Sequence, residues 1–313
     1  MAQWYGCTFM CHRCHAKATY DNDSFTRFNY DHQPRTHADY IQSFTADALP
    51  GFVHLAFFHL DMVLPDWMHV VCLGFGQTVV GCTLVELCHS GAFGFMHVGE
   101  SRTRVLAQLR HAYSIFKVWA AANAKTHSQR TFTIATLGLS DSSVISPGKC
   151  PEFKGKAFNT MVVLQWLASI AQDDPDMHAE YRGILLRSLS RQWDLFARCK
   201  SVYFTERDTQ LYVRDASRTL TALKALFIES RTGGGHLWSL RPKTHLFKHI
   251  MDRVRLTRRN PASHWCFSDE RYVGYMSKCL PTLAGVGRRH AGKRLLQRHY
   301  IRVRLRLLRR EIH

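Results

Sequence analysis

Nearly all of the positive charge of this chain lies in its last quarter. Residues 236–313 contain 19 Lys and Arg against 4 Asp and Glu, which is a net charge of +15 out of +18 for the whole chain. Residues 1–150 and 151–235 have net charges of only +1 and +2. A segment with so much positive charge either binds a polyanion or remains unpaired, with its charges repelling one another. Nucleic acid is the commonest polyanionic partner, because each phosphate that the protein neutralises releases counterions and adds affinity. We therefore predict a nucleic-acid-binding protein, with DNA favoured over RNA and an anionic membrane surface as the rival partner.

The rest of the composition fits a folded protein of a reducing compartment. Hydrophobic residues make up 46% of the chain and charged residues 21%, enough for a core. The N-terminus shows no secretory signal, and the longest apolar stretches, such as Val70–Val80, are interrupted by Gly and too short to span a bilayer. Ten Cys without such a signal favour buried or metal-bound thiols over disulfides. Together with a DNA partner, these features predict a nuclear location and no membrane association.

Hydrophobic periodicity predicts two strands in a chain that is otherwise largely helical. Phe52–Leu60 and Thr131–Leu139 are short apolar runs typical of buried strands. Apolar residues at helical spacing predict helices over 67–88, 101–124, 157–171, 178–204, 215–229, 245–255, 271–279 and 292–310. Composition and the motifs described below divide the chain into four regions. These are a Cys/His-rich element (1–48), a region with both predicted strands (49–139), a helical region (140–235) and a basic region (236–313).

A Cys/His cluster opens the chain. Cys7, Cys11 and Cys14 have the spacing C-x3-C-x2-C, and His15 follows directly. Thiolates two to four residues apart on a turn can share one tetrahedral zinc ion. We predict a zinc site here, whose fourth ligand is His15, His32 or His37. The alternative is a set of surface or core thiols without metal.

Two acidic positions could hold a divalent cation. Asp66 follows the first predicted strand, with His69 one helical turn further on, and a carboxylate at a strand end can bind a hard cation such as magnesium. Asp269 and Glu270 stand at the start of a short predicted helix and are half of the four acids in residues 236–313. When each acidic position is considered alone, a structural role is favoured over cation binding. Asp66 would then be a helix N-cap, and Asp269 or Glu270 a helix cap or an ion-pair partner.

Basic residues that could contact phosphates lie around a predicted helix and along the C-terminal one. His245 and His249 are four residues apart and share one helix face. They could ligate metal, but no acid lies between them as in H-E-x-x-H, so phosphate contact is favoured. The alternative for all of these positions is a solvated basic face. The predicted nucleic-acid contacts are Arg241, Lys243, Lys248, Arg258, Arg259, Arg298, Arg302, Arg306 and Arg309.

Five segments, in this order, resemble transposases of the CACTA type and their relatives. These are Cys11–Cys14 (CHRC), Leu64–Gly74 (LPDWMHVVCLG), Phe153–Ala157 (FKGKA), Leu240–His245 (LRPKTH) and residues 260–274. The resemblance covers nearly the full chain, and the order of the segments is its most specific part.

The resemblance implies an α/β fold with a large α-helical part: a ribonuclease-H-like core interrupted by a helical insertion. It also implies DNA strand cleavage and transfer by two divalent ions, Mg or Mn, held by an acidic triad. Asp66 matches the second acid, His69 its companion and Glu270 the third acid, with Asp269 as its neighbour. The family's first acid precedes the Cys-rich element, whereas the first Asp here is Asp21.

The missing match for the first acid makes catalysis by this chain doubtful. We therefore expect a partial core, from a fragment or remnant that retains DNA binding and forms homo-oligomers as the resemblance implies. The alternative is a noncatalytic nucleic-acid-binding protein that uses the basic C-terminal helix and a zinc site.

Overall fold

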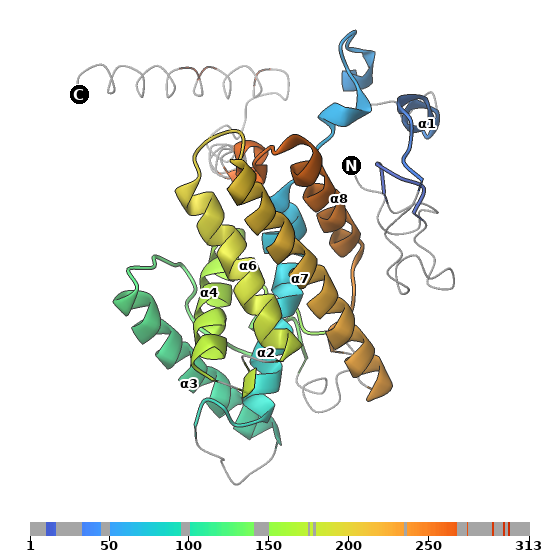
Figure 1. The fold of residues 1–313 in the computed structure, drawn as a ribbon. Coiled ribbons are helices and arrows are strands. Elements are labelled where there is room, and N and C mark those ends of the chain that lie inside the picture. Colours follow the sequence, from blue (N-terminus) through green and yellow to red (C-terminus); the bar gives the residue numbers. More distant parts are fainter. Residues whose placement is uncertain are drawn as a thin grey trace, which may run out of the picture. The chain divides into compact units, whose positions relative to one another are not determined.

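The computed structural model describes most of the chain up to residue 267. The described residues are 11–16, 33–44, 51–94, 101–140, 150–174, 176–177, 180–234, 237–267 and the single positions 274, 290, 297 and 300. Two compact units are present, Met1–His264 and Trp265–His313. The α-helices that the structure describes in the first unit are α1 (His37–Gln42), α2 (Gly76–His89), α3 (Ser101–Ala122), α4 (Ala157–Asp173), α6 (Tyr181–Arg198), α7 (Glu206–Thr232) and α8 (Pro242–Thr257) (Figure 1).

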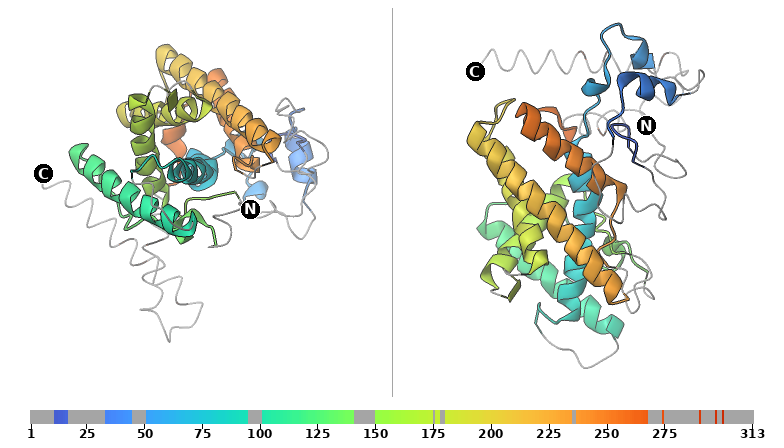
Figure 2. Two further views of the ribbon diagram at one scale, coloured as in Figure 1. Left: turned by 90° about the horizontal axis from the view of Figure 1, so that it is seen from below. Right: turned by 45° about the vertical axis from the view of Figure 1, so that its right-hand side comes forward.

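Helix α2 lies at the centre of this unit. It continues a wider, π-type helical segment, η5 (Met68–Phe75), and all of its side chains except Glu86 and His89 are buried. A helix that is apolar all round must be covered on every side, and the other large helices lie around α2 when it is viewed nearly end-on (Figure 2, left). Met68–His89 is also long and apolar enough to cross a membrane, with a mean hydropathy of 1.7, which corrects the expectation that this apolar stretch is too short. Its most apolar window is 89% buried inside the protein, as expected of a core helix.

Two glycines explain how the central segment packs so closely. At Gly74 the backbone leaves the helical region (φ −129°, ψ −127°), and the Nζ of Lys243 on α8 donates to the carbonyl of Leu73 at this break, at 2.6 Å. At Gly81 a Cβ atom would lie only 2.9 Å from the carbonyl carbon of Pro151. Both glycines are therefore points where neighbouring segments approach the helix backbone.

Most of the predicted helices are confirmed. The segments predicted over 67–88, 101–124, 157–171, 178–204, 215–229 and 245–255 are all helical in large part. Helix α7 begins at Glu206, nine residues earlier than predicted, where the side chain of Thr205 caps it by accepting from the backbone N–H of Asp208. The helices predicted over 271–279 and 292–310 lie outside the described residues.

The two predicted strands are wrong, and the described residues contain no strand. Gly51–His54 and Leu60–Met62 form short 3-10 turns instead, and Phe57 is 70% exposed, so the first run is not buried in a sheet. The second run is a loop whose carbonyls at Thr136 and Leu137 accept from the N–H groups of residues 154 and 152. In the second run, buried Phe132 packs against Phe116 of α3 and Trp166 of α4. A short apolar run gives the same sequence signal whether it packs on helices or lies in a sheet.

Candidate metal centre

The two cysteines of the CHRC segment lie on a short loop. Its backbone is fixed by two hydrogen bonds to the segment 33–35: His15 N–H donates to Gln33 O (3.1 Å) and Arg35 N–H to Arg13 O (2.9 Å). Inside the loop, the N–H of Arg13 donates to the Sγ of Cys11 at 3.3 Å. This turn directs both sulfur atoms to the same side.

The side chain of Arg13 attaches the loop to the rest of the unit. Its guanidinium donates to the carbonyl of Leu60 (3.0 Å) and to the carboxylate of Asp61 (2.9 Å). Asp61 also lies 3.8 Å from the guanidinium of Arg253 on α8. The loop is thereby held beside α8.

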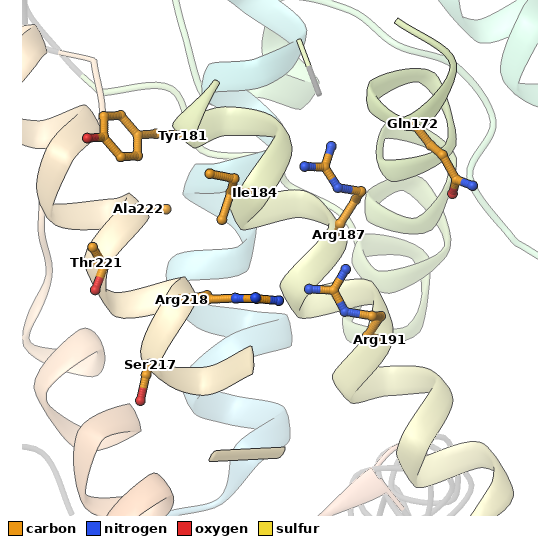
Figure 3. A pocket seen from close by; sticks show the side chains of 9 residues that line it. All are labelled: Gln172, Tyr181, Ile184, Arg187, Arg191, Ser217, Arg218, Thr221 and Ala222. Atoms are coloured by element: carbon orange, nitrogen blue, oxygen red, sulfur yellow. The ribbon is translucent and has the colours of Figure 1, made fainter. Parts of the chain in front are cut away.

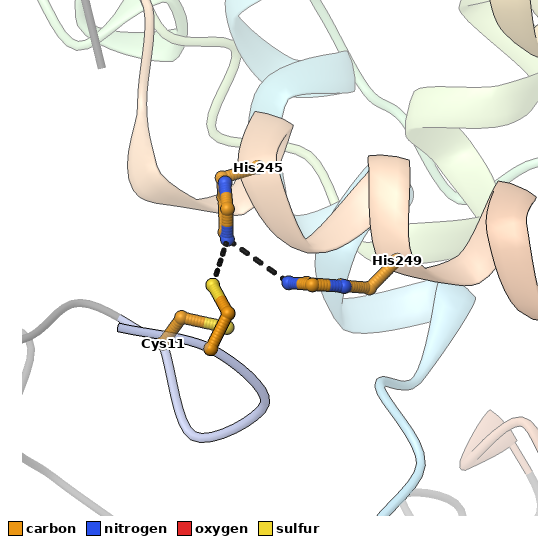
Figure 4. Close-up of side chains that lie close together, drawn as sticks. Cys11, His245 and His249 are labelled. Atoms are coloured by element: carbon orange, nitrogen blue, oxygen red, sulfur yellow. Dashed lines mark hydrogen bonds between the residues drawn. The ribbon is translucent and has the colours of Figure 1, made fainter. Parts of the chain in front are cut away.

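Helix α8 supplies two imidazoles that face this loop. It begins with Pro242 in its first turn, where the missing N–H costs no hydrogen bond. His245 and His249 follow one turn apart, so they project from the same face. His245 is fully buried, and its Nε2 lies 3.0 Å from the Nε2 of His249. Figure 4 shows both rings directed at the cysteine loop.

Four donor atoms converge at this place. The Sγ of Cys14 is 3.1 Å from the Nε2 of His245. The ligand atoms of Cys11, Cys14, His245 and His249 all lie within 4.8 Å of one another. In a tetrahedral zinc site with bonds of about 2.0–2.3 Å, neighbouring ligand atoms lie roughly 3.3–3.8 Å apart. The cluster can therefore hold a metal ion such as zinc with only small side-chain movements.

The electrostatics of the cluster favour a thiolate on Cys14. Its pKa is lowered chiefly by the hydrogen bond from the Cys11 thiol and further by hydrogen bonds from His245 and His249. The same bond to Cys14, together with burial, raises the pKa of Cys11. One proton is thus shared by a buried thiol pair next to two imidazoles. Because the thiolate is the form that ligates metal, a cation entering the cluster would displace this proton.

The structure corrects the predicted ligand set. Cys11 and Cys14 belong to the cluster, but His15 does not, because its Nε2 points to Asp39 at 3.7 Å. The candidate His37 is also engaged elsewhere, since its Nδ1 accepts from the N–H of Leu60. The other two candidates, Cys7 and His32, lie outside the described residues. The two histidines of α8 complete the described cluster with Cys11 and Cys14, so their preferred assignment to phosphate contacts is corrected as well.

A sequence signal for the complete site did exist. C-x-x-C supplies two ligands and H-x-x-x-H on a helix supplies two more, so each is half of a four-ligand site. Neither half indicates its partner, because 231 positions separate Cys14 from His245.

Asp66 acts as a helix cap, as its structural alternative predicts. Its carboxylate accepts from the backbone N–H of Met68 (3.2 Å) and of His69 (3.1 Å), and the His69 ring Nδ1 lies 2.5 Å from it. The side chain is only 12% exposed. The two other predicted acids, Asp269 and Glu270, lie outside the described residues.

Several predicted phosphate contacts are engaged within the protein. Lys243 is partly buried, which lowers its pKa, and it binds the Leu73 carbonyl, so it stabilises the break in the central helix. Arg241 pairs with Glu152 at 3.2 Å and Lys248 with Asp252 at 2.5 Å. The two remaining described positions are Arg258, which is exposed, and Arg259, which is half-buried. The predicted contacts outside the described residues are Arg298, Arg302, Arg306 and Arg309.

Comparisons with known proteins add no relationship to these observations. No protein-family model matches the chain, and searches among curated proteins and solved structures return no match. Function is therefore inferred from the chemistry of the residues themselves.

Proposed function

We propose that the chain binds one zinc ion at the Cys11–Cys14–His245–His249 cluster, and that this ion fastens the N-terminal loop to α8. The observation that carries the proposal is the convergence of four donor atoms from two distant segments, within 4.8 Å of one another. Three of the four side chains are buried. Four protein ligands leave no open coordination position, which is typical of a structural site.

The donor set selects the metal. Two thiolates and two imidazoles suit zinc, whereas magnesium and manganese prefer carboxylate, carbonyl and water oxygens. The Mg or Mn of the proposed strand-cleavage chemistry would therefore bind elsewhere, at Asp66 and Glu270, with Asp269 as the neighbouring candidate.

The metal content of the purified chain tests the zinc proposal. Elemental analysis is expected to find one zinc per chain in the wild type and a large loss in Cys14→Ser/His249→Ala. Cys199→Ser/His127→Ala is the matched control, because it removes one thiol and one imidazole outside the cluster and should keep the zinc. Circular dichroism shows whether each variant is folded, and a cobalt titration of the wild type gives a second readout through the absorption bands of tetrahedral cobalt with thiolate ligands. Full zinc in the cluster variant, or no zinc or cobalt uptake by the wild type, would refute the site.

We further propose that this metal centre belongs to a transposase-like, DNA-binding protein of the nucleus. The order of the resembling segments and the net charge of +15 in residues 236–313 support this proposal. The finer expectation is a ribonuclease-H-like strand-transfer enzyme or its remnant, which acts as a homo-oligomer and uses Asp66 and Glu270, with His69 beside Asp66.

A noncatalytic nucleic-acid-binding protein is the second candidate. It is favoured by the position of Asp66, whose two carboxylate oxygens already accept backbone N–H groups at the start of η5. A carboxylate engaged as a cap needs no cation to explain its presence.

Nicking of supercoiled plasmid with magnesium or manganese distinguishes the two candidates. The enzyme proposal expects nicking that Asp66→Asn and Glu270→Gln each abolish while zinc content and DNA binding persist. Binding without nicking supports the noncatalytic protein. Removal of Arg288–His313 is expected to weaken DNA binding and to flatten its dependence on salt, because fewer phosphates are neutralised. An unchanged salt slope would refute a role for this segment.

A further inference from the structure

A cavity lies between α6 and α7, beside the end of α4. Its volume is about 780 Å³, within the range of ligand-binding pockets, which is roughly 300–1,000 Å³. Figure 3 shows the side chains that line it, with the guanidinium groups of Arg187, Arg191 and Arg218 reaching into the space between the helices. The described residues that line it include no acid.

Arginine side chains are the charged groups among the described residues that line this cavity. The guanidinium of Arg191 binds both oxygens of Asp215, at 2.9 and 3.0 Å, and that carboxylate is buried in α7. Arg214 and Arg218 lie 3.5 and 3.8 Å from the same Asp215, so three guanidinium groups, two of them at the cavity, share this one acid. Arg187 is held toward the cavity by its hydrogen bond to the carbonyl of Ala171. Burial, and after it the neighbouring charge of Arg191, lowers the pKa of Arg187.

The remaining lining suits a phosphate ester. Gln172 and Thr221 add polar side chains to the lining, whereas the hydroxyl of Ser217 donates to the Sδ of Met251 on α8. Tyr181 lines the same cavity and is 44% exposed, so its ring offers a face on which a base can stack. Guanidinium forks that match phosphate oxygens, beside an exposed aromatic ring, are typical of sites that hold single-stranded nucleic acid.

We propose that the cavity between α6 and α7 is a separate binding site for a phosphate group of a single nucleic-acid strand, held by Arg187 and Arg218. The choice of a strand over a free phosphate compound rests on the proposed DNA-binding function. The site itself depends neither on the metal cluster nor on the basic C-terminal residues. Arg191 has a positioning role, because it binds the carboxylate of Asp215, to which Arg218 is also close.

The full-length protein tests this proposal with two probes, a fluorescent thymidine 20-mer and inorganic pyrophosphate. Arg187→Gln/Arg218→Gln is expected to weaken 20-mer binding roughly tenfold and to reduce its salt slope by about 0.7 per lost phosphate contact. Arg207→Gln/Arg231→Gln is the matched control, because it removes two exposed arginines of α7 that do not line the cavity and lie outside residues 236–313. Arg187→Lys/Arg218→Lys, which keeps the charge and loses the forks, should fall between the two. Thermal unfolding checks that every variant is folded.

The outcomes separate this site from the wider DNA-binding function. Loss of 20-mer binding in the cavity variant but not in the control supports the strand site. Loss of pyrophosphate binding alone supports a phosphate site whose source is a free phosphate compound, even if the wild type binds no DNA. Equal effects of the cavity variant and the control on both probes, or no binding of either probe by the wild type, would overturn the proposal.

Discussion

The Sγ of Cys14 lies 3.1 Å from the Nε2 of His245, although 231 positions separate the two residues. In small zinc modules the ligands come from neighbouring turns, and the metal organises a short stretch of chain. Here the cysteines come from a loop near the N-terminus and the histidines from α8, which packs on the π-type segment before the central helix. A metal ion at this place would therefore fix the loop to an already folded helical body.

Removal of the metal should expose two thiols without unfolding the helices. A strong chelator is expected to make Cys11 and Cys14 reactive toward a thiol reagent, whereas Cys72 and Cys82, which are fully buried on the central segment, stay protected. The measurement is the number of reactive thiols per native chain before and after chelation, with circular dichroism as the check on helix content. Cys199→Ser should lower the count before chelation and leave the increase unchanged. An unchanged count in the wild type would contradict a metal at the cluster.

Loss of the Asp66 cap should destabilise the central helix. Asp66→Ala removes the acceptor for two backbone N–H groups and is expected to lower the free energy of unfolding by about 0.5–2 kcal/mol. Thr205→Ala at the start of α7 removes a comparable cap and should have a similar cost. Urea denaturation measures both changes. If Asp66→Ala leaves stability unchanged, the carboxylate has no capping role, and a catalytic reason for its presence becomes stronger.

The half-buried carboxylate of Glu86 should make stability fall as pH rises. Glu86 accepts from the indole N–H of Trp238 (2.6 Å) and from Arg182 (2.9 Å), yet burial raises its pKa above the usual 4.5. The folded protein then binds a proton that the unfolded chain has already released, so this contribution is present below pH 4.5 and is lost as pH rises through the raised pKa. The free energy of unfolding of the wild type minus that of Glu86→Gln should therefore decrease from pH 4 upward. A difference that increases with pH would contradict the direction of the shift.

The close contact at Gly81 should not tolerate a side chain. In Gly81→Ala the new Cβ would lie 2.9 Å from the carbonyl carbon of Pro151 and 3.0 Å from the nitrogen of Glu152, both backbone atoms that cannot move alone. We expect a loss of about 1–3 kcal/mol in the free energy of unfolding, the usual cost of overpacking a core. Gly51→Ala is the control, because nothing lies within 4 Å of its Cβ position. Equal stabilities of the two variants in thermal denaturation would show that the 150–152 loop can shift.

The helices were largely predictable from the sequence, and the strands were not. Long segments such as 101–122 have an apolar stripe at helical spacing, which is a strong signal. The run at 52–60 is short and apolar, and its state depends on whether another strand lies beside it. Here it forms turns near the cysteine loop, with Phe57 exposed, so its apolar residues indicated burial that the fold does not provide.

The metal site was half predictable for a related reason. Local spacing identified Cys11 and Cys14 as candidate ligands, and it placed His245 and His249 on one helix face. No local rule joins the two pairs, because their meeting depends on how α8 packs against the rest of the unit. The arginines of the cavity between α6 and α7 show the same limit, since Arg187 and Arg218 come together only through packing of two helices.

The distance along the chain between the two ligand pairs also sets an order of events during synthesis. The cysteines leave the ribosome long before α8 is made, so a nascent chain carries an exposed dithiol that still lacks its imidazoles. Any product interrupted before His245 keeps this dithiol open to oxidation or to capture by other metals. Completion of the cluster would thus mark those chains whose translation has passed α8.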